Sequence, residues 1–600
     1  MADHHHHPEP TTNDTMAQHR RPDGTGTGST STSTETSPAP HPATTHTDGK
    51  HISKKNTNSS YNDNKDEDGD GGLPGAGQAA AALDPGKETR TADGRRVLGE
   101  DDAEDALSFG MPEWRKWMIL VIILLIQTSM NSNASMYGFA VDGLAEKYEV
   151  TPETARLGQM AFLVAYAFGC ELWAPWSEEI GRWPTQQASL FLVNIWQISS
   201  ALSPTFGGVI ASRVLGGLST SGGSVTLGVI ADMYRPEDTG FQYAVAFVIL
   251  SSVGGSPAGA VIGGFVGQYR SVEWIFWTLL IMGGIVQVVH FFLVPETNPF
   301  ILLDREAKKR RKNGQEVYGP NEVKVKRFSL KETGKIWWRP YYMLLTEPIV
   351  IWLSLLSGFS DMLVFVFLEA FTPIFKQYGF ETHQIGLAFM GTIVAYIIAY
   401  CTYLPVIWHH NKTRKIDPDR LSPESRLWWL LWLAPLLPIG LFGFAWTSFG
   451  PDKSHWIAPI IFAAVIGISN YGVYKSSIDY MLAAYGPFGA SATGGNDFAR
   501  DFLAGIAALY AHPFYESVGP KEYHLVYPST ILACMGVIFI IPIYIFYWKG
   551  PQIRLRSKFA QELEKSRQER LSRKKRRTSS VAAGAGEKAT MKQAQHVEDV

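Results

Sequence analysis

Two carboxylic acids, Asp361 and Glu369, interrupt an apolar stretch that is long enough to cross a lipid bilayer as a helix. A charge at that depth costs about 2.5–3.5 kcal/mol on insertion scales, so it needs a partner or a water-filled cavity. On a helix the two acids lie about 80° apart around the axis and ~12 Å apart along it, so both can face one cavity. Burial favours the protonated form of such an acid and a bound cation favours the ionised form, so that protons and a cationic solute would compete for it. The alternative for each acid is a structural bond to a neighbouring helix.

Further polar residues interrupt other apolar stretches. Arg213 could pair with an acid that alternates between a proton and the arginine, or it could form a structural salt bridge. Asp497, Arg500 and Asp501 fall within about one helical turn, which allows local pairing but leaves one acid in excess. Asn133 offers hydrogen bonds to a cavity or, equally, to a neighbouring helix. The candidate residues for substrate and proton coupling are therefore Asp361, Glu369, Arg213, Asp497, Asp501 and Asn133.

The elements that must position these residues are apolar segments that recur from residue 115 onward. Spanning a bilayer takes about 20 apolar residues in a helix, and twelve segments reach that length. They begin near Trp117, Ala155, Thr185, Gly208, Phe241, Trp274, Thr346, Ile385, Leu427, Trp456, Gly489 and Val526. The sequence therefore predicts an all-α membrane protein.

Lysine and arginine, which are retained on the cytoplasmic side of a membrane, set the orientation. They concentrate in the connection after the sixth segment, in the connection after the eighth, and in the C-terminal tail. Both ends of the chain are therefore expected in the cytoplasm, with two six-helix halves on either side of a basic loop. The expected regions are a disordered N-terminal tail (1–110), the first half (111–295), the basic loop (296–342), the second half (343–548) and a basic C-terminal tail (549–600).

Composition argues against several other classes of protein. The net charge of −2 gives no case for nucleic acid as a partner. Cys170, Cys401 and Cys534 fit no spacing of a metal site or a disulfide framework. The glycine-rich stretch near residue 255 lacks the preceding strand and the lysine of a phosphate-binding loop. We expect no enzyme activity and no cofactor, and transport would have to draw on an ion or solute gradient.

Four short motifs occur in a fixed order, and they are APWSEEIGRWP at 174–184, RVLGG at 213–217, GGSPAGAVIGG at 254–264 and VPET at 294–297. Their order and spacing resemble the major facilitator superfamily, specifically its twelve-helix drug:proton antiporters of the fungal multidrug and polyamine exporter type. The resemblance covers roughly residues 111–560. Three positions depart from the usual forms: Glu179 and Trp183 stand where basic residues are common, and Ser256 where a glycine normally precedes the proline.

The resemblance implies roles for residues of the first motif. In this family the motif is a short cytoplasmic loop, in which Gly181 makes the turn while Glu178 and Arg182 latch neighbouring helices. Glu171, close to the same end of the second helix, is expected to be a partner in that latch rather than a substrate ligand.

The third motif places small residues four apart, which lets two helices in a membrane approach closely. The resemblance implies that Gly255, Gly259 and Gly263 form a rocking surface between the two halves, and ordinary tight packing is the alternative. Pro257 lacks an amide donor and should loosen the helix one turn earlier.

The resemblance implies a major facilitator fold and an alternating-access transporter that exchanges protons for polyamines, drugs or other cationic or amphipathic solutes. A proton-coupled importer or facilitator is one alternative, and a transport-silent membrane sensor is another. The expected partners are the lipid bilayer, a small-molecule substrate and protons, with the chain acting as a monomer. The expected location is the plasma membrane, with the vacuolar membrane as the alternative.

Overall fold

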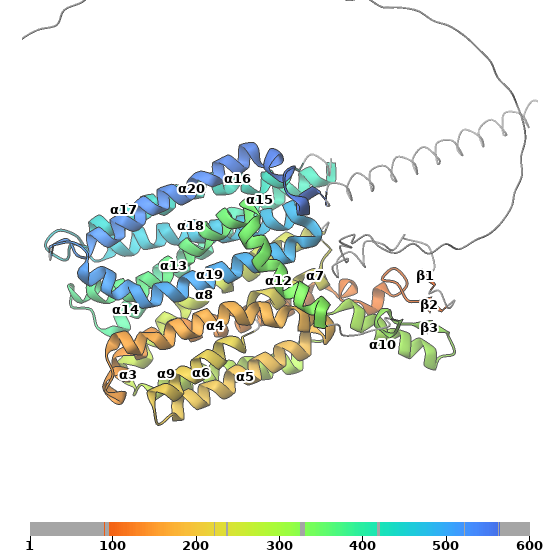
Figure 1. The fold of residues 1–600 in the computed structure, drawn as a ribbon, viewed down its shortest axis with the longest axis horizontal. Coiled ribbons are helices and arrows are strands. Elements are labelled where there is room, and N and C mark those ends of the chain that lie inside the picture. The colour runs from red at the N-terminus through yellow and green to blue at the C-terminus, as the bar shows by residue number, and fades with distance from the viewer. Residues whose placement is uncertain are drawn as a thin grey trace, which may run out of the picture. The chain divides into compact units, whose positions relative to one another are not determined.

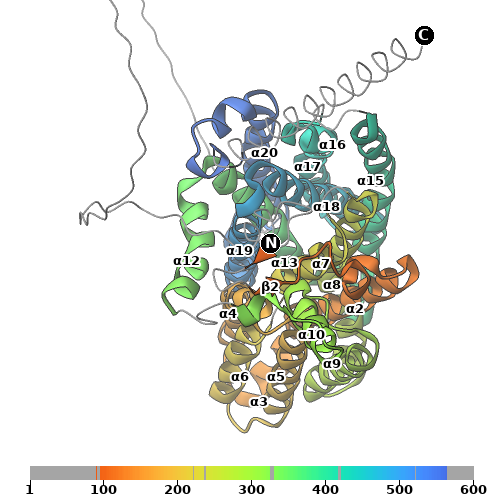
Figure 2. The same ribbon diagram turned by 90° about the vertical axis from the view of Figure 1, so that its right-hand side faces the viewer.

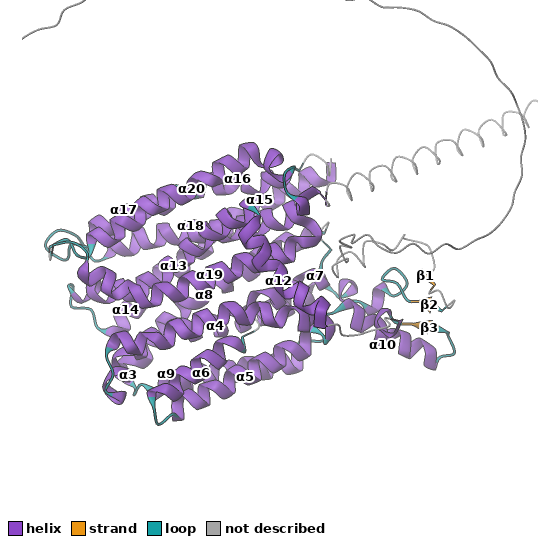
Figure 3. Ribbon diagram, viewed as in Figure 1, coloured by secondary structure: helices purple, strands orange, loops and turns teal. Residues whose placement is uncertain are grey.

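The computed structural model describes residues 89–90, 95–220, 222–235, 238–323, 330–416, 421–520, 522–561 and 563. Almost all of this part of the chain is helical (Figure 3). Most of the two predicted tails lies outside the described residues.

The helices of the first half run from orange to yellow-green in Figure 1. Their order along the chain matches the six predicted segments. They are α2 (Glu113–Ser135), η3 (Met136–Ala140) and α3 (Val141–Tyr148), then α4 (Pro152–Glu179), α5 (Arg182–Leu202), α6 (Phe206–Leu218), α7 (Gly222–Met233), α8 (Thr239–Tyr269) and α9 (Glu273–Leu293).

The helices of the second half run from green to blue (Figure 1). They are α13 (Pro348–Lys376), α14 (Thr382–Ala388), α15 (Met390–Ile416), η5 (Pro423–Leu427), α16 (Trp428–Leu433), α17 (Leu436–Thr447), α18 (Ile457–Tyr485), η6 (Gly486–Phe488), α19 (Gly489–Ser517) and α20 (Val526–Arg554). The predicted starting points fall close to the starts of these helical segments.

Within the described residues, nine helical segments are long and apolar enough to cross a membrane. Three further segments complete the predicted twelve, namely α5, α6 with α7, and α19. Polar side chains lower the hydropathy of α5 and α19, whereas α6 and α7 are each shorter than a full span. The all-α architecture predicted from the sequence is confirmed.

Helix α13, which carries Asp361 and Glu369, is the most enclosed of these segments. Its most apolar stretch is 83% buried, against 33% for α20. Because α13 is surrounded by other helices, its charged side chains must find partners inside the protein rather than in lipid or water.

A small folded region, built from chain on both sides of the first half, lies outside the apolar helices. β1 (Thr89–Arg90) pairs antiparallel with β2 (Arg96–Val97), which pairs parallel with β3 (Val317–Tyr318). Two short helices, η1 (Glu104–Ala106) and η2 (Ser108–Gly110), follow β2. The loop after the first half contains α10 (Pro299–Lys312), α11 (Pro320–Val323) and α12 (Leu330–Thr346).

This region differs from the expected disordered tail at 1–110. Leu98, Ala103 and Leu107 are buried against Leu303 and Ala307 of α10. The segment has too few apolar residues to form a core alone, but it folds because α10 supplies the other side of one.

Candidate functional site

The clearest site for proton chemistry is a buried cluster where α13 packs along α19. Asp361 Oδ2 lies 3.5 Å from Arg500 Nε, and Asp501 Oδ1 lies 3.9 Å from the same nitrogen. All three residues are at least nine-tenths buried. The acid on one helix and the arginine on the other therefore link α13 to α19.

Two further groups extend this cluster. The Tyr474 hydroxyl donates to Asp497 Oδ1 at 2.9 Å, and the Tyr474 ring lies 4.2 Å from the Arg500 guanidinium carbon. Arg500 Nη2 also donates to the main-chain carbonyl of Ser252 on α8, at 3.4 Å. Since α8 belongs to the first half and α19 to the second, this arginine bridges the two halves.

Glu171 of α4 completes the cluster from the first half. Its side chain is buried, and it is close enough to Asp497 to interact electrostatically. A side chain on Gly494 of α19 would meet the Glu171 carboxylate within about 3 Å, so α4 and α19 touch at this point. The prediction that Glu171 belongs to the cytoplasmic latch is wrong, because its side chain points to the other half.

The cluster, here called the Arg500 cluster, contains Glu171, Asp361, Asp497, Asp501, Arg500 and Tyr474. Four of these described residues are acids, and one, Arg500, is a permanent cation. Several ionised carboxylates cannot share a dry interior with a single guanidinium, because each uncompensated charge carries a large desolvation cost. Some of the acids must therefore be protonated or neutralised by a further cation.

Glu369 does not join this cluster. Its Oε2 accepts a hydrogen bond from Arg156 Nε of α4 at 3.0 Å, and both side chains are at least nine-tenths buried. Asp361 and Glu369, which the sequence allows to face one cavity, are therefore each paired with a different arginine. The Arg156–Glu369 pair ties the two halves together about two helical turns from Asp361.

Arg213 has no acid beside it among the described residues. Its Nε donates to the carbonyl of Gly158 at 3.2 Å and its Nη2 to the carbonyl of Asn133 at 2.9 Å. The rings of Tyr137 and Phe162 lie 4.7 and 4.1 Å from the guanidinium carbon. The pairing that we predicted for Arg213 is wrong, because carbonyl groups and aromatic faces of the first half enclose the charge.

Asn133 takes part in the packing of the first half. Its Nδ2 donates to the Ser129 carbonyl at 2.9 Å, and its Oδ1 accepts from Gln197 Nε2. Both bonds are made within the first half. Asn133 therefore bonds neighbouring helix groups, which was the alternative to a role in a cavity.

The motif at 174–184 does form a latch, but with another acid. Arg182 Nε donates to Asp232 Oδ2 at 2.9 Å, whereas Glu178 is exposed and contributes its carbonyl, which accepts from Asn298 Nδ2 at 3.0 Å. Gly181 turns the chain at a φ of +117°, where other residues are strained. The hydrogen-bonded partner of Arg182 in this latch is the buried Asp232, and Glu178 adds an electrostatic interaction with the same arginine.

Gly255, Gly259 and Gly263 of α8 pack against α2 and η3 of the same half. A Cβ on Gly259 would lie 2.7 Å from Ser132 Cα, and one on Gly255 would lie 2.7 Å from Asn131 Cβ. These three glycines therefore serve tight packing within the first half, and they do not form the rocking surface between the halves. α8 continues through the buried Pro257. Gly264, next to Gly263, packs against the second half at Gly386 of α14.

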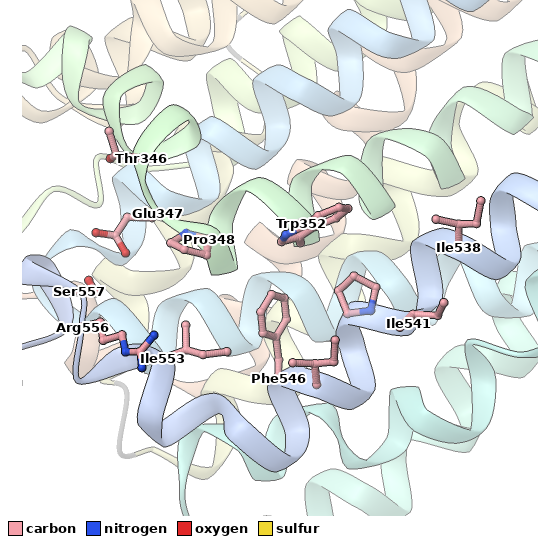
Figure 4. Close-up of a pocket in the computed structure, with 12 residues that line it drawn as sticks. Thr346, Glu347, Pro348, Trp352, Ile538, Ile541, Phe546, Ile553, Arg556 and Ser557 are labelled. Atoms are coloured by element: carbon pink, nitrogen blue, oxygen red, sulfur yellow. The ribbon is translucent and has the colours of Figure 1, made fainter. Parts of the chain in front are cut away.

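A large cavity of about 670 Å³ lies away from these charges, between α13 and α20 (Figure 4). Its walls are apolar, and Trp352 and Ile541 are 41% and 51% exposed on the outer surface of the helices. Glu347, Arg556 and Ser557 lie at one end (Figure 4). A groove on the outside of membrane-crossing helices faces lipid, so we do not assign it to the transported solute.

Comparison with known proteins agrees with this fold. The profile of the Major Facilitator Superfamily matches residues 121–509. The chain belongs to the Major Facilitator Superfamily. It is therefore a multi-pass membrane transporter with the superfamily's two six-helix halves.

Relatives of this transporter are known in fungi. The MFS-type transporter kojT of Aspergillus flavus is 30% identical over 480 residues, which is 77% of this chain and 82% of kojT. The multidrug transporter FLR2 of Candida glabrata is 27% identical and covers 77% of this chain and 78% of its own. Among solved structures, the xylose transporter XylE from E. coli has a TM-score of 0.49 and 14% identity, over 72% of this chain and 98% of that one.

Sequence reasoning missed Arg156 and Asp232 among the transporter's charged contacts, and it assigned Glu171 to the wrong contact. Arg156 and Glu171 interrupt the same apolar segment fifteen residues apart, which places them on similar faces of α4. That shared face was the available signal that both point to the second half. Asp232 carries no comparable signal.

Proposed function

We propose that this transporter is a proton-coupled antiporter that exports cationic or amphipathic small molecules, with polyamines and drugs as the leading classes. The observation that carries the proposal is the excess of buried acids in the Arg500 cluster. Each excess carboxyl group must bind a proton or lie beside a cation, so that a cationic solute and a proton are mutually exclusive occupants.

The cluster lies at a position suited to coupling. Arg500 contacts Asp361 and Asp501 within the second half and Ser252 of the first half. Protonation of an acid would weaken its hold on Arg500 and change the contact with α8. A change in charge at one place would thereby alter the contact between the halves.

The Arg156–Glu369 pair is proposed to stabilise one of the two alternating states. It joins α4 of the first half to α13 of the second, so the halves cannot separate there without breaking it. Arg213, Asn133 and the Arg182–Asp232 latch lie within the first half, and we propose that they keep that half rigid as it moves.

The name of the multidrug transporter FLR2 supports a drug-like solute, and the excess of acids favours positive charge on it. We further propose that both ends of the chain are cytoplasmic, because the loop between the halves is rich in lysine and arginine. The proposed location is the plasma membrane, and the proposed transporting unit is the monomer.

The test is uptake of labelled spermidine and of a fluorescent organic cation into sealed liposomes that contain the purified chain. We expect uptake to be faster with a pH gradient than without one, and to be accompanied by proton movement in the opposite direction. Equal rates with and without the gradient would contradict proton coupling, and proton movement in the same direction as the solute would identify an importer.

A further inference from the structure

A second, smaller cavity opens beside the Arg500 cluster, where α12 of the central loop passes α4. It has a volume of about 240 Å³. In Figure 2, α12 runs along the flank of the helices next to α19 and α4. The residues that line the cavity are Phe168, Glu171 and Leu172 of α4, Leu218 of α6, and Trp337 and Tyr341 of α12.

Glu171 supplies the cavity with a negative group. The residue is 6% exposed, and its Oε1 has no hydrogen-bond partner among the described residues. A buried carboxylate that makes no hydrogen bond is costly unless a proton or a cation neutralises it. The carboxylate therefore gives the cavity an intrinsic preference for positive charge.

Aromatic rings of α4 and α12 form a wall of the same cavity. The Phe168 and Tyr341 ring centres lie 6.4 Å apart, and Phe498 of α19 packs edge-on against both, at 5.0 and 4.9 Å. Burial, and then the charge of Glu171, raises the pKa of Tyr341 to about 12, so its ring stays neutral at physiological pH. A neutral aromatic face attracts a cation through its quadrupole.

The cavity also shares an acid, Glu171, with the Arg500 cluster. Glu171 interacts electrostatically with Asp497, and α19 carries both Asp497 and the ring of Phe498. A cation held beside Glu171 would therefore have a second acid, Asp497, near it. The cavity thus adjoins the Arg500 cluster.

We propose that the cavity lined by Phe168, Glu171, Trp337 and Tyr341 is an entry site for organic cations that carry an aromatic or alkyl body. Glu171 binds the charge, and the aromatic wall binds the body. The proposal rests on the proposed function in one respect, namely that the bound cation is the solute that the transporter carries.

The test is equilibrium binding of radiolabelled N-methyl-phenylpyridinium to the purified full-length chain, without any gradient. Phenylpyridine at mildly alkaline pH is the neutral control ligand, since it has a similar shape and no charge. The variants are Tyr341→Leu and Glu171→Gln. Tyr342→Leu is the matched control, because Tyr342 is the neighbouring tyrosine on α12, is 47% exposed and does not line the cavity.

We expect Glu171→Gln to weaken cation binding about tenfold, since it removes the charge. Tyr341→Leu should weaken it about threefold, the size of one cation–π contact, while Tyr342→Leu changes it by less than about twofold. Phenylpyridine should bind weakly and equally to all four proteins. Tyr341 lies on α12, outside the membrane-crossing segments, so Tyr341→Leu should not disturb their folding. This variant keeps the proposal testable if Glu171→Gln fails to fold.

Equal affinities for Tyr341→Leu and Tyr342→Leu would overturn the proposal, as would a wild-type chain that binds the neutral ligand as tightly as the cation. These outcomes are independent of the liposome test. Cation binding that depends on Tyr341, in a chain whose transport ignores a pH gradient, would uphold the entry site and reject proton antiport. Gradient-driven transport, with cation binding unaltered in both variants, would uphold proton coupling and reject the entry site.

Discussion

Helices α8 and α19 hold comparable places in the two halves, but only the contact of α19 adds buried charges to close packing. α8 packs along α2, and α19 packs along α13. The first contact depends on glycines at which an added Cβ would meet the neighbouring backbone, as at Gly259 and Ser132. The second also packs a glycine, Gly358, against the backbone of Ala499, but it adds the charges of Asp361 and Arg500. A contact between backbones has one geometry, whereas a contact between ionisable groups changes with protonation and can therefore respond to a gradient.

The largest expected effect comes from breaking the glycine contact. Gly259→Leu would place its Cβ 2.7 Å from Ser132 Cα, and the backbone of α2 cannot move aside. Extra methylene groups in a packed core cost about 1–3 kcal/mol, and a clash with backbone costs more. We expect the yield of monodisperse protein in size-exclusion chromatography to fall by about tenfold or more.

Gly284→Leu on α9 is the control for this variant, because no atom lies within 4 Å of a Cβ at that position. Equal yields of the two variants would show that the α2–α8 contact tolerates side chains. The contrast between the two helix pairs would then be lost.

The next effect concerns the charged contact. Asp361→Asn keeps the shape of the side chain and removes the acid that meets Arg500. We expect the protein to fold and its transport rate in a pH gradient to drop to the rate measured without one. The neighbouring Ser360→Ala is the control, since the Ser360 hydroxyl has no hydrogen-bond partner among the described residues. Gradient-driven uptake that survives in Asp361→Asn would remove Asp361 from the coupling site.

An intermediate effect is expected at the ion pair between the halves. Arg156→Glu and Glu369→Arg each place like charges together, and the double exchange restores the pair with its direction reversed. We expect each single variant to lower the thermal midpoint, and the double variant to recover part of the loss. The coupling energy should be about 1–3 kcal/mol, as for residues in direct contact. Strictly additive effects would show that the two side chains act independently.

The smallest effect is expected at an ion pair outside the membrane, which gives a scale for the buried ones. Arg311 Nη2 lies 2.8 Å from Glu322 Oε1, and the hydrogen bond from Arg311 lowers the pKa of Glu322. This pair stabilises the folded loop above the unfolded pKa of Glu322, and the stabilisation is lost as pH falls through the lower, folded value. Glu322→Gln should cost less than about 1 kcal/mol.

The measurement for Glu322→Gln is hydrogen exchange at Val317 and Tyr318, which should become faster without any change in transport. Lys312→Gln is the control for removal of a charge from the same loop. Exchange that is accelerated equally by both variants would mean that the pair contributes nothing specific.

The number, length and order of the membrane-crossing segments could be read from the sequence, because a span is defined by side-chain polarity over a continuous stretch of chain. The same reasoning found Asp361, Asp497 and Asp501, because a charge inside such a stretch is costly and therefore easy to notice. The resemblance to the family, and not hydropathy, pointed to Gly181, where a tight turn joins two helices.

Only the tertiary structure decided which charges meet. Glu369 lies on the same helix as Asp361 but bonds Arg156, which is 213 residues away in the sequence. Arg182 bonds Asp232, which is 50 residues away in the sequence, and Arg213 meets carbonyl groups rather than an acid. The rotation of each helix about its axis determines these pairs, and that rotation is set by packing among helices distant in sequence. Hydropathy reports how deep a residue lies, and contact between helices determines what it faces.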